Sequence, residues 1–148
     1  MVKKWLVAIV DDELDIVNLF RDALSRINEL SIFTFTDPQS AFEHIRMNKS
    51  KYAVVISDLR MPGVNGMDLL YKIKKESPIV RTLLMTAFEV NDKVFDEYIK
   101  NKIIDGFLQK PLKLSDLESE VHNQINIYKK SISNKNDISN EHQPVNDT

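Results

Sequence analysis

Five short apolar runs alternate with helical patterns along this chain, and this alternation constrains its fold more than any other feature. The runs occupy residues 5–10, 32–36, 53–57, 82–86 and 106–108. The first, third and fourth are almost continuously apolar, which is typical of strands that are buried on both faces of a parallel sheet. The second and fifth are shorter or more mixed, so we expect them nearer the edges of the sheet.

Between and after these runs, apolar residues recur with the 3.6-residue period of an amphipathic helix. The helical patterns cover residues 16–27, 41–45, 67–74, 94–99 and 114–128. Asp37 before Pro38 predicts an N-cap followed by a proline in the first turn, and Asn65 with Asp68 resembles a capping box. The strand–helix order, repeated five times, predicts an α/β domain with one parallel sheet and helices on both faces.

The composition fits one soluble domain and excludes several kinds of site. The 148 residues are 43% hydrophobic and 28% charged, with a net charge of −2. That balance gives no electrostatic reason to bind nucleic acid or an anionic membrane. The chain has no cysteine, which excludes disulfides, thiolate nucleophiles and zinc–cysteine sites. With no apolar run near the ~20 residues of a membrane span and no signal peptide, we expect a cytoplasmic protein.

Two polar segments are interpreted as solvent-facing. Residues 132–148 are rich in Asn and Ser and nearly free of apolar side chains, so we predict a folded domain over 1–131 and a disordered tail over 132–148. The basic run of Lys72, Lys74 and Lys75 is expected on the solvated face of its helix.

Charged and hydroxyl residues follow the predicted strands at the points where these end. Asp11 and Asp12 follow the first run, Asp58 follows the third, Thr86 ends the fourth and Lys110 follows the fifth. Each alone has an ordinary explanation as a helix cap, a turn residue or a solvated side chain. Because the carboxyl ends of parallel strands lie at one edge of the sheet, together they predict three carboxylates, a hydroxyl and an ammonium in one pocket.

Such a cluster of carboxylates requires a cation. Two carboxylates about 4 Å apart repel each other by about 4 kcal/mol at an effective dielectric constant of 20. Mg²⁺ suits carboxylate oxygens and recruits phosphate oxygens as further ligands. A carboxylate beside it can act as a nucleophile toward phosphorus, while a lysine and a hydroxyl bind the equatorial oxygens. The pocket is therefore predicted to accept a phosphoryl group on an aspartate.

Four segments carry a resemblance to a known family. They are Asp11-Asp12, Asp58-Leu-Arg-Met-Pro-Gly-Val-Asn-Gly66, Thr86-Ala87 and Lys110-Pro111. In this order and on these strands they resemble the receiver domain of response regulators in two-component phosphorelay signalling, over about residues 4–130. The resemblance implies the flavodoxin-like (βα)5 fold, with a five-stranded parallel sheet in the order 2-1-3-4-5. It also suggests a stand-alone, single-domain member.

The resemblance implies roles for the pocket residues. Asp58 is expected to be the phosphoacceptor and Lys110 to pair with the phosphate. Asp12 and Asp58 are expected to bind Mg²⁺ directly, with the backbone carbonyl of Arg60, while Asp11 acts mainly through a water.

The resemblance also implies a switch and a lifetime for the phosphorylated state. Thr86 is expected to move toward the phosphate while the aromatic ring of Phe107 turns inward, and Lys110-Pro111 to be joined by a cis peptide bond. Arg60 and Phe88 flank the expected approach of the hydrolytic water. Because both restrict that water, we expect a long-lived phosphorylated form.

The implied partners are proteins. A sensor histidine kinase or a phosphotransfer protein is expected to supply the phosphoryl group. The chain is then not a turnover enzyme, although it assists its own phosphorylation and dephosphorylation. Its output is expected through an unidentified protein that binds the fourth helix, fifth strand and fifth helix, where Tyr98, Ile99 and Lys102 are candidates. We expect a monomer or weak dimer.

Three other functions are compatible with some of these features. A flavin mononucleotide module needs a phosphate loop after the first strand, where Asp11 and Asp12 would repel the phosphate. An Asp-nucleophile phosphatase usually carries a second Asp two residues after the nucleophile, and Arg60 occupies that position. A receiver-fold interaction module that acts without phosphorylation remains as an alternative.

Overall fold

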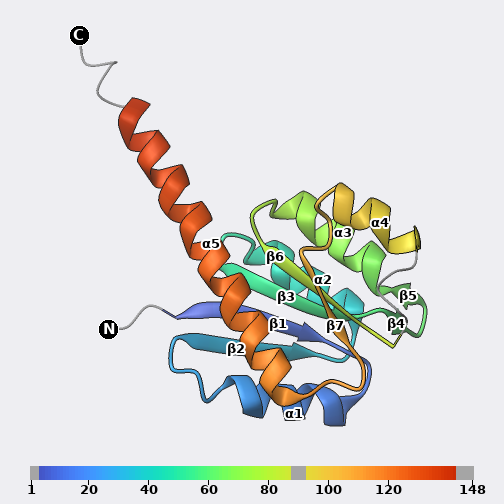
Figure 1. Ribbon diagram of the computed structural model, residues 1–148. Helices are drawn as coiled ribbons and strands as arrows, with labels where there is room; N and C mark the ends of the chain where they lie inside the picture. Colours follow the sequence, from blue (N-terminus) through green and yellow to red (C-terminus); the bar gives the residue numbers. More distant parts are fainter. Residues whose placement is uncertain (1–3, 88–92, 143–148) are drawn as a thin grey trace.

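Five parallel strands form the centre of the molecule in the computed structural model, which describes residues 4–87 and 93–142 (Figure 1). The strands are β1 (Trp5–Val10), β2 (Leu30–Phe35), β3 (Tyr52–Asp58), β6 (Arg81–Thr86) and β7 (Gly106–Gln109). They pair in the order β2-β1-β3-β6-β7, which is 2-1-3-4-5 when the two short strands β4 and β5 are left out of the numbering. The predicted fold and strand order are confirmed.

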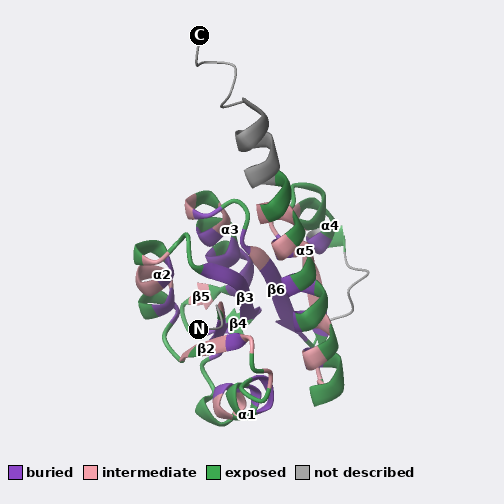
Figure 2. Ribbon diagram, turned by 90° about the vertical axis from the view of Figure 1, so that its left-hand side faces the viewer, coloured by how far each residue is buried: buried purple, intermediate pink, exposed green. Residues whose placement is uncertain are grey.

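Helices cover both faces of this sheet (Figure 2). They are α1 (Leu14–Leu24), α2 (Pro38–Met47), α3 (Gly66–Glu76), α4 (Lys93–Lys100) and α5 (Leu114–His142). One buried cluster joins side chains of α1 and α5 to the sheet, and a second joins those of α2, α3 and α4. The molecule therefore has three layers, with α1 and α5 on one face and α2, α3 and α4 on the other.

The apolar character of the strands follows from this arrangement. Along β1, Val7 and Ile9 belong to the α1–α5 cluster, whereas Ala8 and Val10 belong to the opposite one. Every residue of β3 is buried. Because alternate side chains of a central strand enter two different cores, the sequence is continuously apolar and does not alternate.

Local signals fix the beginnings of two helices. The carboxylate of Asp37 accepts a hydrogen bond from the backbone N–H of Ser40 at 3.1 Å, at the start of α2. The side-chain oxygen of Asn65 accepts one from the N–H of Met67 at 2.8 Å, at the start of α3. Both predicted N-caps are confirmed, and each satisfies a backbone donor that the helix leaves without an internal partner.

Between β3 and α3 the chain forms a small hairpin that the periodicity did not predict. Its antiparallel strands are β4 (Arg60–Met61) and β5 (Val64–Asn65). Gly63 in the turn has a φ of +74°, which favours glycine. Gly66 then opens α3 so close to β3 that a Cβ there would collide with the carbonyl oxygen of Asp58.

The last helix is longer than the sequence pattern indicates. α5 continues through residues 132–142 and extends beyond the sheet (Figure 1), which differs from the disordered tail predicted from residue 132 onward. Ile132 packs against the α1–α5 cluster, so the packed part of the helix reaches past residue 131. Since a helix that is already nucleated grows at low cost, and no Gly or Pro occurs between residues 114 and 142, the backbone continues as a helix.

One of the three lysines expected on a solvated face is mostly buried. The Lys74 side chain is 12% exposed, and its Nζ lies 2.7 Å from a carboxylate oxygen of Asp105. The same Nζ donates to the carbonyl of Val80 at 2.6 Å. Lys72 and Lys75 are exposed as predicted.

None of the helices in the described part of the chain has the length and apolar character of a membrane span.

Candidate functional site

The ends of four strands bring the predicted site residues together. Val10 of β1 is level with Ser57 of β3, and Asp58 of β3 is level with Met85 of β6. Thr86 of β6 is level with Gln109 of β7. Because these strands are parallel and end at nearly the same level, the residues at their carboxyl ends share one edge of the sheet.

Three carboxylates form the acidic part of this edge. Asp11, Asp12 and Asp58 each offer an oxygen atom, and these atoms all lie within 4.8 Å of one another. Asp11 is completely buried and Asp58 is 8% exposed, whereas Asp12 faces solvent. The cluster is thus held inside the protein on one side and is accessible from the solvent on the other.

Lys110 is the basic partner of two of these carboxylates. Its Nζ lies 2.9 Å from Oδ1 of Asp58 and 3.6 Å from Oδ2 of Asp11. Burial lowers the pKa of Lys110, but the hydrogen bond to Asp58 and the charges of Asp58 and Asp11 outweigh it and raise that pKa. The backbone N–H of Lys110 donates to the carbonyl of Thr86 at 2.8 Å, which anchors this loop to β6.

Asp11 has a buried oxygen that is suited to a cation. Burial and the nearby charge of Asp58 raise the pKa of Asp11. Two groups act against this rise: the backbone N–H of Glu13, which donates to Oδ1 at 3.0 Å, and the charge of Lys110. Its other oxygen, Oδ2, is buried and accepts no hydrogen bond from the part of the chain that the structure describes. A buried carboxylate oxygen without a donor, beside two further carboxylates, fits a hard divalent cation such as Mg²⁺.

A hollow of about 130 Å³ lies next to Asp58. That is several times the ~30 Å³ occupied by a water molecule in the liquid. The residues around it lie at or just after the ends of β3, β6 and β7 and at the start of β4. They are Asp58, Leu59, Arg60, Thr86, Ala87 and Lys110. The Asp58 carboxylate therefore borders a space that also touches an ammonium and a hydroxyl-bearing residue.

The structure also places the predicted switch residues. Thr86 is 1% exposed at the end of β6. Phe107 lies on the neighbouring strand β7, half-buried, and its ring packs edge-to-face on Phe95 of α4 with 5.4 Å between the ring centres. The Lys110–Pro111 bond is cis, as expected. Arg60 is exposed beside the hollow, while Phe88 lies outside the described residues.

Two features of the site escaped the sequence reasoning. Gly66 permits α3 to begin against the carbonyl of Asp58, and its N–H donates to the carbonyl of Leu59 at 2.7 Å. The Asn65-Gly66 pair was a usable signal, because glycine often marks a close backbone approach. Gln109 donates from its side-chain amide to the carbonyl of Thr86 at 3.2 Å, and no sequence pattern indicated that contact.

Comparisons with known proteins agree with this geometry. The family model described as the response regulator receiver domain matches residues 7–122. The regulatory protein LuxO of Vibrio cholerae is 31% identical over 134 residues, which are 90% of this chain and 28% of LuxO. The DNA-binding transcriptional regulator NtrC of Escherichia coli is 28% identical over 86% of this chain and 26% of NtrC. The chain thus spans about a quarter of the length of these curated relatives.

Solved structures show the same fold. A response regulator receiver domain protein from Clostridium thermocellum is 26% identical, with a TM-score of 0.73 over 84% of this chain and 97% of that chain. A CheY-like receiver domain protein from Methanospirillum hungatei has a TM-score of 0.75 over 87% of this chain and 99% of that chain. The latter is only 19% identical, so it supports the fold alone.

Proposed function

The chain belongs to the response regulator receiver domain family, and on that premise we propose that it is a signalling switch that accepts a phosphoryl group on Asp58 with the help of Mg²⁺. One observation carries this proposal. The Asp58 carboxylate lies 2.9 Å from the Lys110 ammonium, borders an open hollow, and is within 4.8 Å of two further carboxylates. A nucleophile, a charge-neutralising group and a cation-binding cluster therefore meet at one point.

The three acidic residues differ in burial, and we propose different roles for them. In this proposal Asp12 and Asp58, together with the backbone carbonyl of Arg60, hold Mg²⁺ directly, and buried Asp11 acts mainly through a water. When bound, the ion supplies positive charge that offsets the carboxylates and the oxygens of the incoming phosphoryl group. Asp11 is fixed for this role by the N–H of Glu13, which holds one of its oxygens and leaves the other facing the cluster.

Asp58 and Lys110 carry the transfer itself. An oxygen of the Asp58 carboxylate attacks phosphorus, and the bond from phosphorus to the donor's phosphohistidine nitrogen breaks as the new P–O bond forms. The Lys110 ammonium then shifts from the bare carboxylate to the equatorial oxygens of the phosphoryl group. A sensor histidine kinase or a phosphotransfer protein is the proposed donor, and small acyl phosphates can replace it in vitro.

The readout is proposed to pass through Thr86 and Phe107. The Thr86 hydroxyl moves toward the phosphoryl group, and the Phe107 ring turns into the space that Thr86 vacates. Because Phe107 packs on Phe95, this movement reaches α4 and the face that α4, β7 and α5 form. Of the candidates for contact with an output protein, Ile99 and Lys102 are exposed and Tyr98 is half-buried. Tyr98 and Lys102 line hollows on the side of α4 that faces α3.

The phosphorylated state is proposed to be long-lived. Arg60 is exposed at the rim of the hollow beside Asp58, where its guanidinium can lie over the phosphoryl oxygens and shield phosphorus from water. We propose the same shielding role for Phe88. The chain is then a switch that promotes its own phosphorylation and dephosphorylation rather than a turnover enzyme.

Labelling with acetyl phosphate tests the proposal. The wild-type chain in excess Mg²⁺ should acquire one acid-stable, base-labile phosphoryl group, and Asp58→Asn should abolish it. Asp11→Asn should mainly weaken Mg²⁺ binding, and Asp15→Asn, an exposed carboxylate on α1, should change nothing. Label on Ser57 or His44 would refute Asp58 as the acceptor. A folded wild-type chain that takes no label would instead favour the interaction module that acts without phosphorylation.

A further inference from the structure

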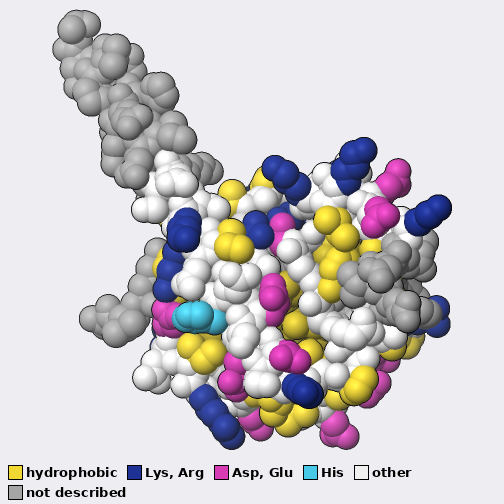
Figure 3. Space-filling model, viewed as in Figure 1, with side chains coloured by type: hydrophobic (Ala, Val, Ile, Leu, Met, Phe, Trp, Pro, Cys, Tyr) yellow, Lys and Arg dark blue, Asp and Glu magenta, His cyan; other side chains and the backbone are white. Residues whose placement is uncertain are grey.

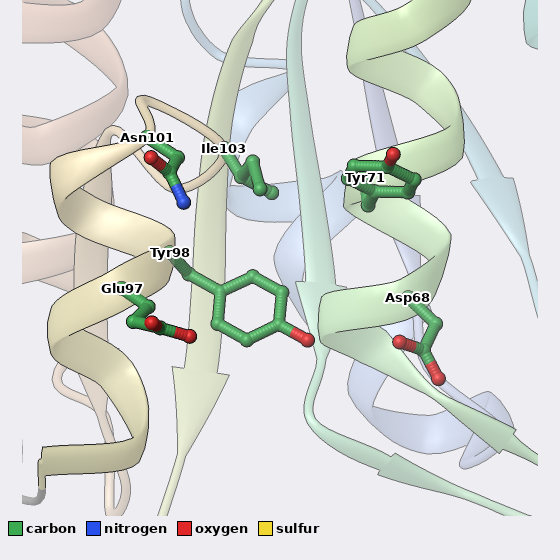
Figure 4. Close-up of a pocket in the computed structure, with 6 residues that line it drawn as sticks. All are labelled: Asp68, Tyr71, Glu97, Tyr98, Asn101 and Ile103. Carbon is green, nitrogen blue, oxygen red and sulfur yellow. The ribbon is translucent and has the colours of Figure 1, made fainter.

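A groove separates α3 from α4 and lies apart from the phosphoacceptor site. Its first part has a volume of about 300 Å³ and is drawn in Figure 4. A second hollow of about 420 Å³ shares its Tyr71, Asn101 and Ile103 and continues it toward the opposite end of α3. Within the part of the chain that the structure describes, no residue of the hollow beside Asp58 lines either part, so the groove is a separate feature of the surface.

Two tyrosines form the walls of this groove. The chain has four tyrosines; Tyr52 and Tyr128 are buried, whereas Tyr71 is 41% exposed and Tyr98 is partly exposed. Figure 4 shows them facing the groove from opposite helices, with Ile103 between them and the Tyr98 hydroxyl directed toward α3. Aromatic rings on both sides of an apolar floor suit an aliphatic stem that carries a planar or ammonium cation.

Opposite charges lie at the two ends of the groove. Asp68 of α3 and Glu97 of α4 are exposed in the first part, and Lys75 and Lys102 are exposed in the second. Asp68 and Lys75 are seven residues apart on α3, so their backbones are separated by about 10 Å along the helix axis. The Lys75 side chain turns back toward Tyr71, and its ammonium lies 4.6 Å from the centre of that ring. Figure 3 shows exposed hydrophobic side chains in this region, with acidic and basic side chains around them.

The backbone at the end of α4 determines where Lys102 lies. Its φ is +59°, the only left-handed value of a non-glycine residue in the described part of the chain. Glycine is the usual residue where a helix ends in this conformation, because a side chain adds strain there. Here the left-handed residue ends α4, since the N–H of Ile103 donates to the carbonyl of Tyr98 at 2.8 Å, and it places an ammonium group on the rim of the groove.

We propose that this groove binds a segment of a partner protein that inserts an Arg or Lys side chain between Tyr71 and Tyr98. The cation is flanked by Asp68 and Glu97. A carboxylate of the same segment, about 10 Å further along α3, pairs with Lys102 and with Lys75, whose ammonium it draws away from the Tyr71 ring. In an extended segment that distance corresponds to three residues. Among the described residues, the groove shares none with the hollow beside Asp58, so the segment binds without touching the phosphoryl group.

A short peptide tests this site on the full chain. The probe is acetyl-Arg-Ala-Ala-Glu-amide, titrated into ¹⁵N-labelled protein with Mg²⁺ in excess so that the cluster at Asp58 is occupied. Saturable changes in amide chemical shift are expected at Tyr71, Tyr98, Asn101 and Ile103. The control peptide, with Gln in place of both charged residues, should bind at least threefold more weakly.

Two variants of α4 provide a matched comparison. Glu97→Gln should raise the Kd of the charged peptide at least threefold, because Glu97 lines the groove. Asp96→Asn makes the same change in charge at an exposed neighbour that does not line it, and should leave the Kd unchanged. Equal effects of the two variants, equal binding of the neutral peptide, or shifts confined to the edge around Asp11 and Asp58 would overturn the proposal. None of these results depends on whether Asp58 becomes phosphorylated.

Discussion

At the scale of single residues, the site depends on one ammonium placed between two carboxylates. Lys110 approaches Asp58 to 2.9 Å and buried Asp11 to 3.6 Å. It thus reduces carboxylate repulsion before phosphorylation and is positioned for the phosphoryl oxygens afterwards. The pKa of Lys110 is raised by these charges in spite of its burial, so the side chain stays protonated throughout the neutral range.

Lys110→Met should therefore slow labelling of the chain by acetyl phosphate. Removal of one preorganised charge that stabilises the transition state costs roughly 10²–10³-fold in rate. The measurement is the initial rate of label incorporation at saturating Mg²⁺. Lys113→Met removes an exposed lysine three residues later and should label at the wild-type rate. If both variants label alike, Lys110 has no role in the transfer.

A second buried ion pair stabilises the opposite edge of the sheet. Asp105 lies 2.7 Å from the Lys74 ammonium, and its carboxylate also accepts from the backbone N–H of Thr82 at 2.9 Å. Burial lowers the pKa of Lys74, although Asp105 acts against it. Asp105→Asn leaves this lysine buried without its anion, which should cost about 3–5 kcal/mol of unfolding free energy.

Urea unfolding measures this loss in free energy. Asp116→Asn, an exposed carboxylate in the first turn of α5, serves as the control and should lose less than about 1 kcal/mol. If Asp105→Asn loses no more unfolding free energy than the control Asp116→Asn, then Lys74 reaches solvent in the variant and the ion pair adds little to stability.

At the scale of elements, periodicity predicts best where burial is regular. β1 and β3 read as continuous apolar runs because both faces of each strand are covered, and the sequence places both of them nearly to the residue. The β4–β5 hairpin has two residues in each strand, which is too short to show any period. Lys74 looked solvated because composition cannot show that a tertiary partner, Asp105, lies 31 positions further along the chain.

The same limit applies to the candidate site. Asp11, Asp58, Thr86 and Lys110 were predictable because parallel strands bring their carboxyl ends to one edge. The contacts that fix them, such as the amide of Gln109 on the Thr86 carbonyl, depend on side-chain direction across two strands. The order of residues along the chain does not show where a side chain such as that of Gln109 points.

The junction of β3 and α3 can be tested through its glycines. Gly66→Ala adds a Cβ against the Asp58 carbonyl, so it should cost about 1–3 kcal/mol of stability and reduce labelling by acetyl phosphate. Gly63→Ala adds a Cβ in open space at a φ of +74°, so it should cost about 1–2 kcal/mol and leave labelling unchanged. Equal labelling of the two folded variants would show that the close approach at Gly66 does not position Asp58.

At the scale of the whole molecule, the sheet separates two cores, and its carboxyl edge carries the chemistry. α5 belongs to the core that also contains α1, and it is the element that continues past the sheet (Figure 1). Near the other end of β1, the ring of Trp5 packs edge-to-face on Tyr128 of α5, with 5.7 Å between ring centres. This contact reports on the packing of α5 far from the phosphoacceptor, since Trp5 begins β1 and Asp11 follows its last residue.

The packed length of α5 determines how much of the C-terminal segment the fold needs. Ile132 lies one turn after Tyr128 and packs on the same cluster. Full burial of an isoleucine side chain contributes at least about 1.5 kcal/mol, and Ile132 is only partly buried. A chain that ends at residue 131 should therefore lose no more than about 1.5 kcal/mol of unfolding free energy. A chain that ends at residue 134 keeps this contact and should unfold like the full chain, with Trp5 fluorescence as the probe. Both truncated chains should be labelled at the full rate, since α5 ends far from Asp58. If the chain ending at 134 is destabilised as much as the shorter one, the helix beyond Ile132 contributes to stability, and the domain extends further than its core indicates.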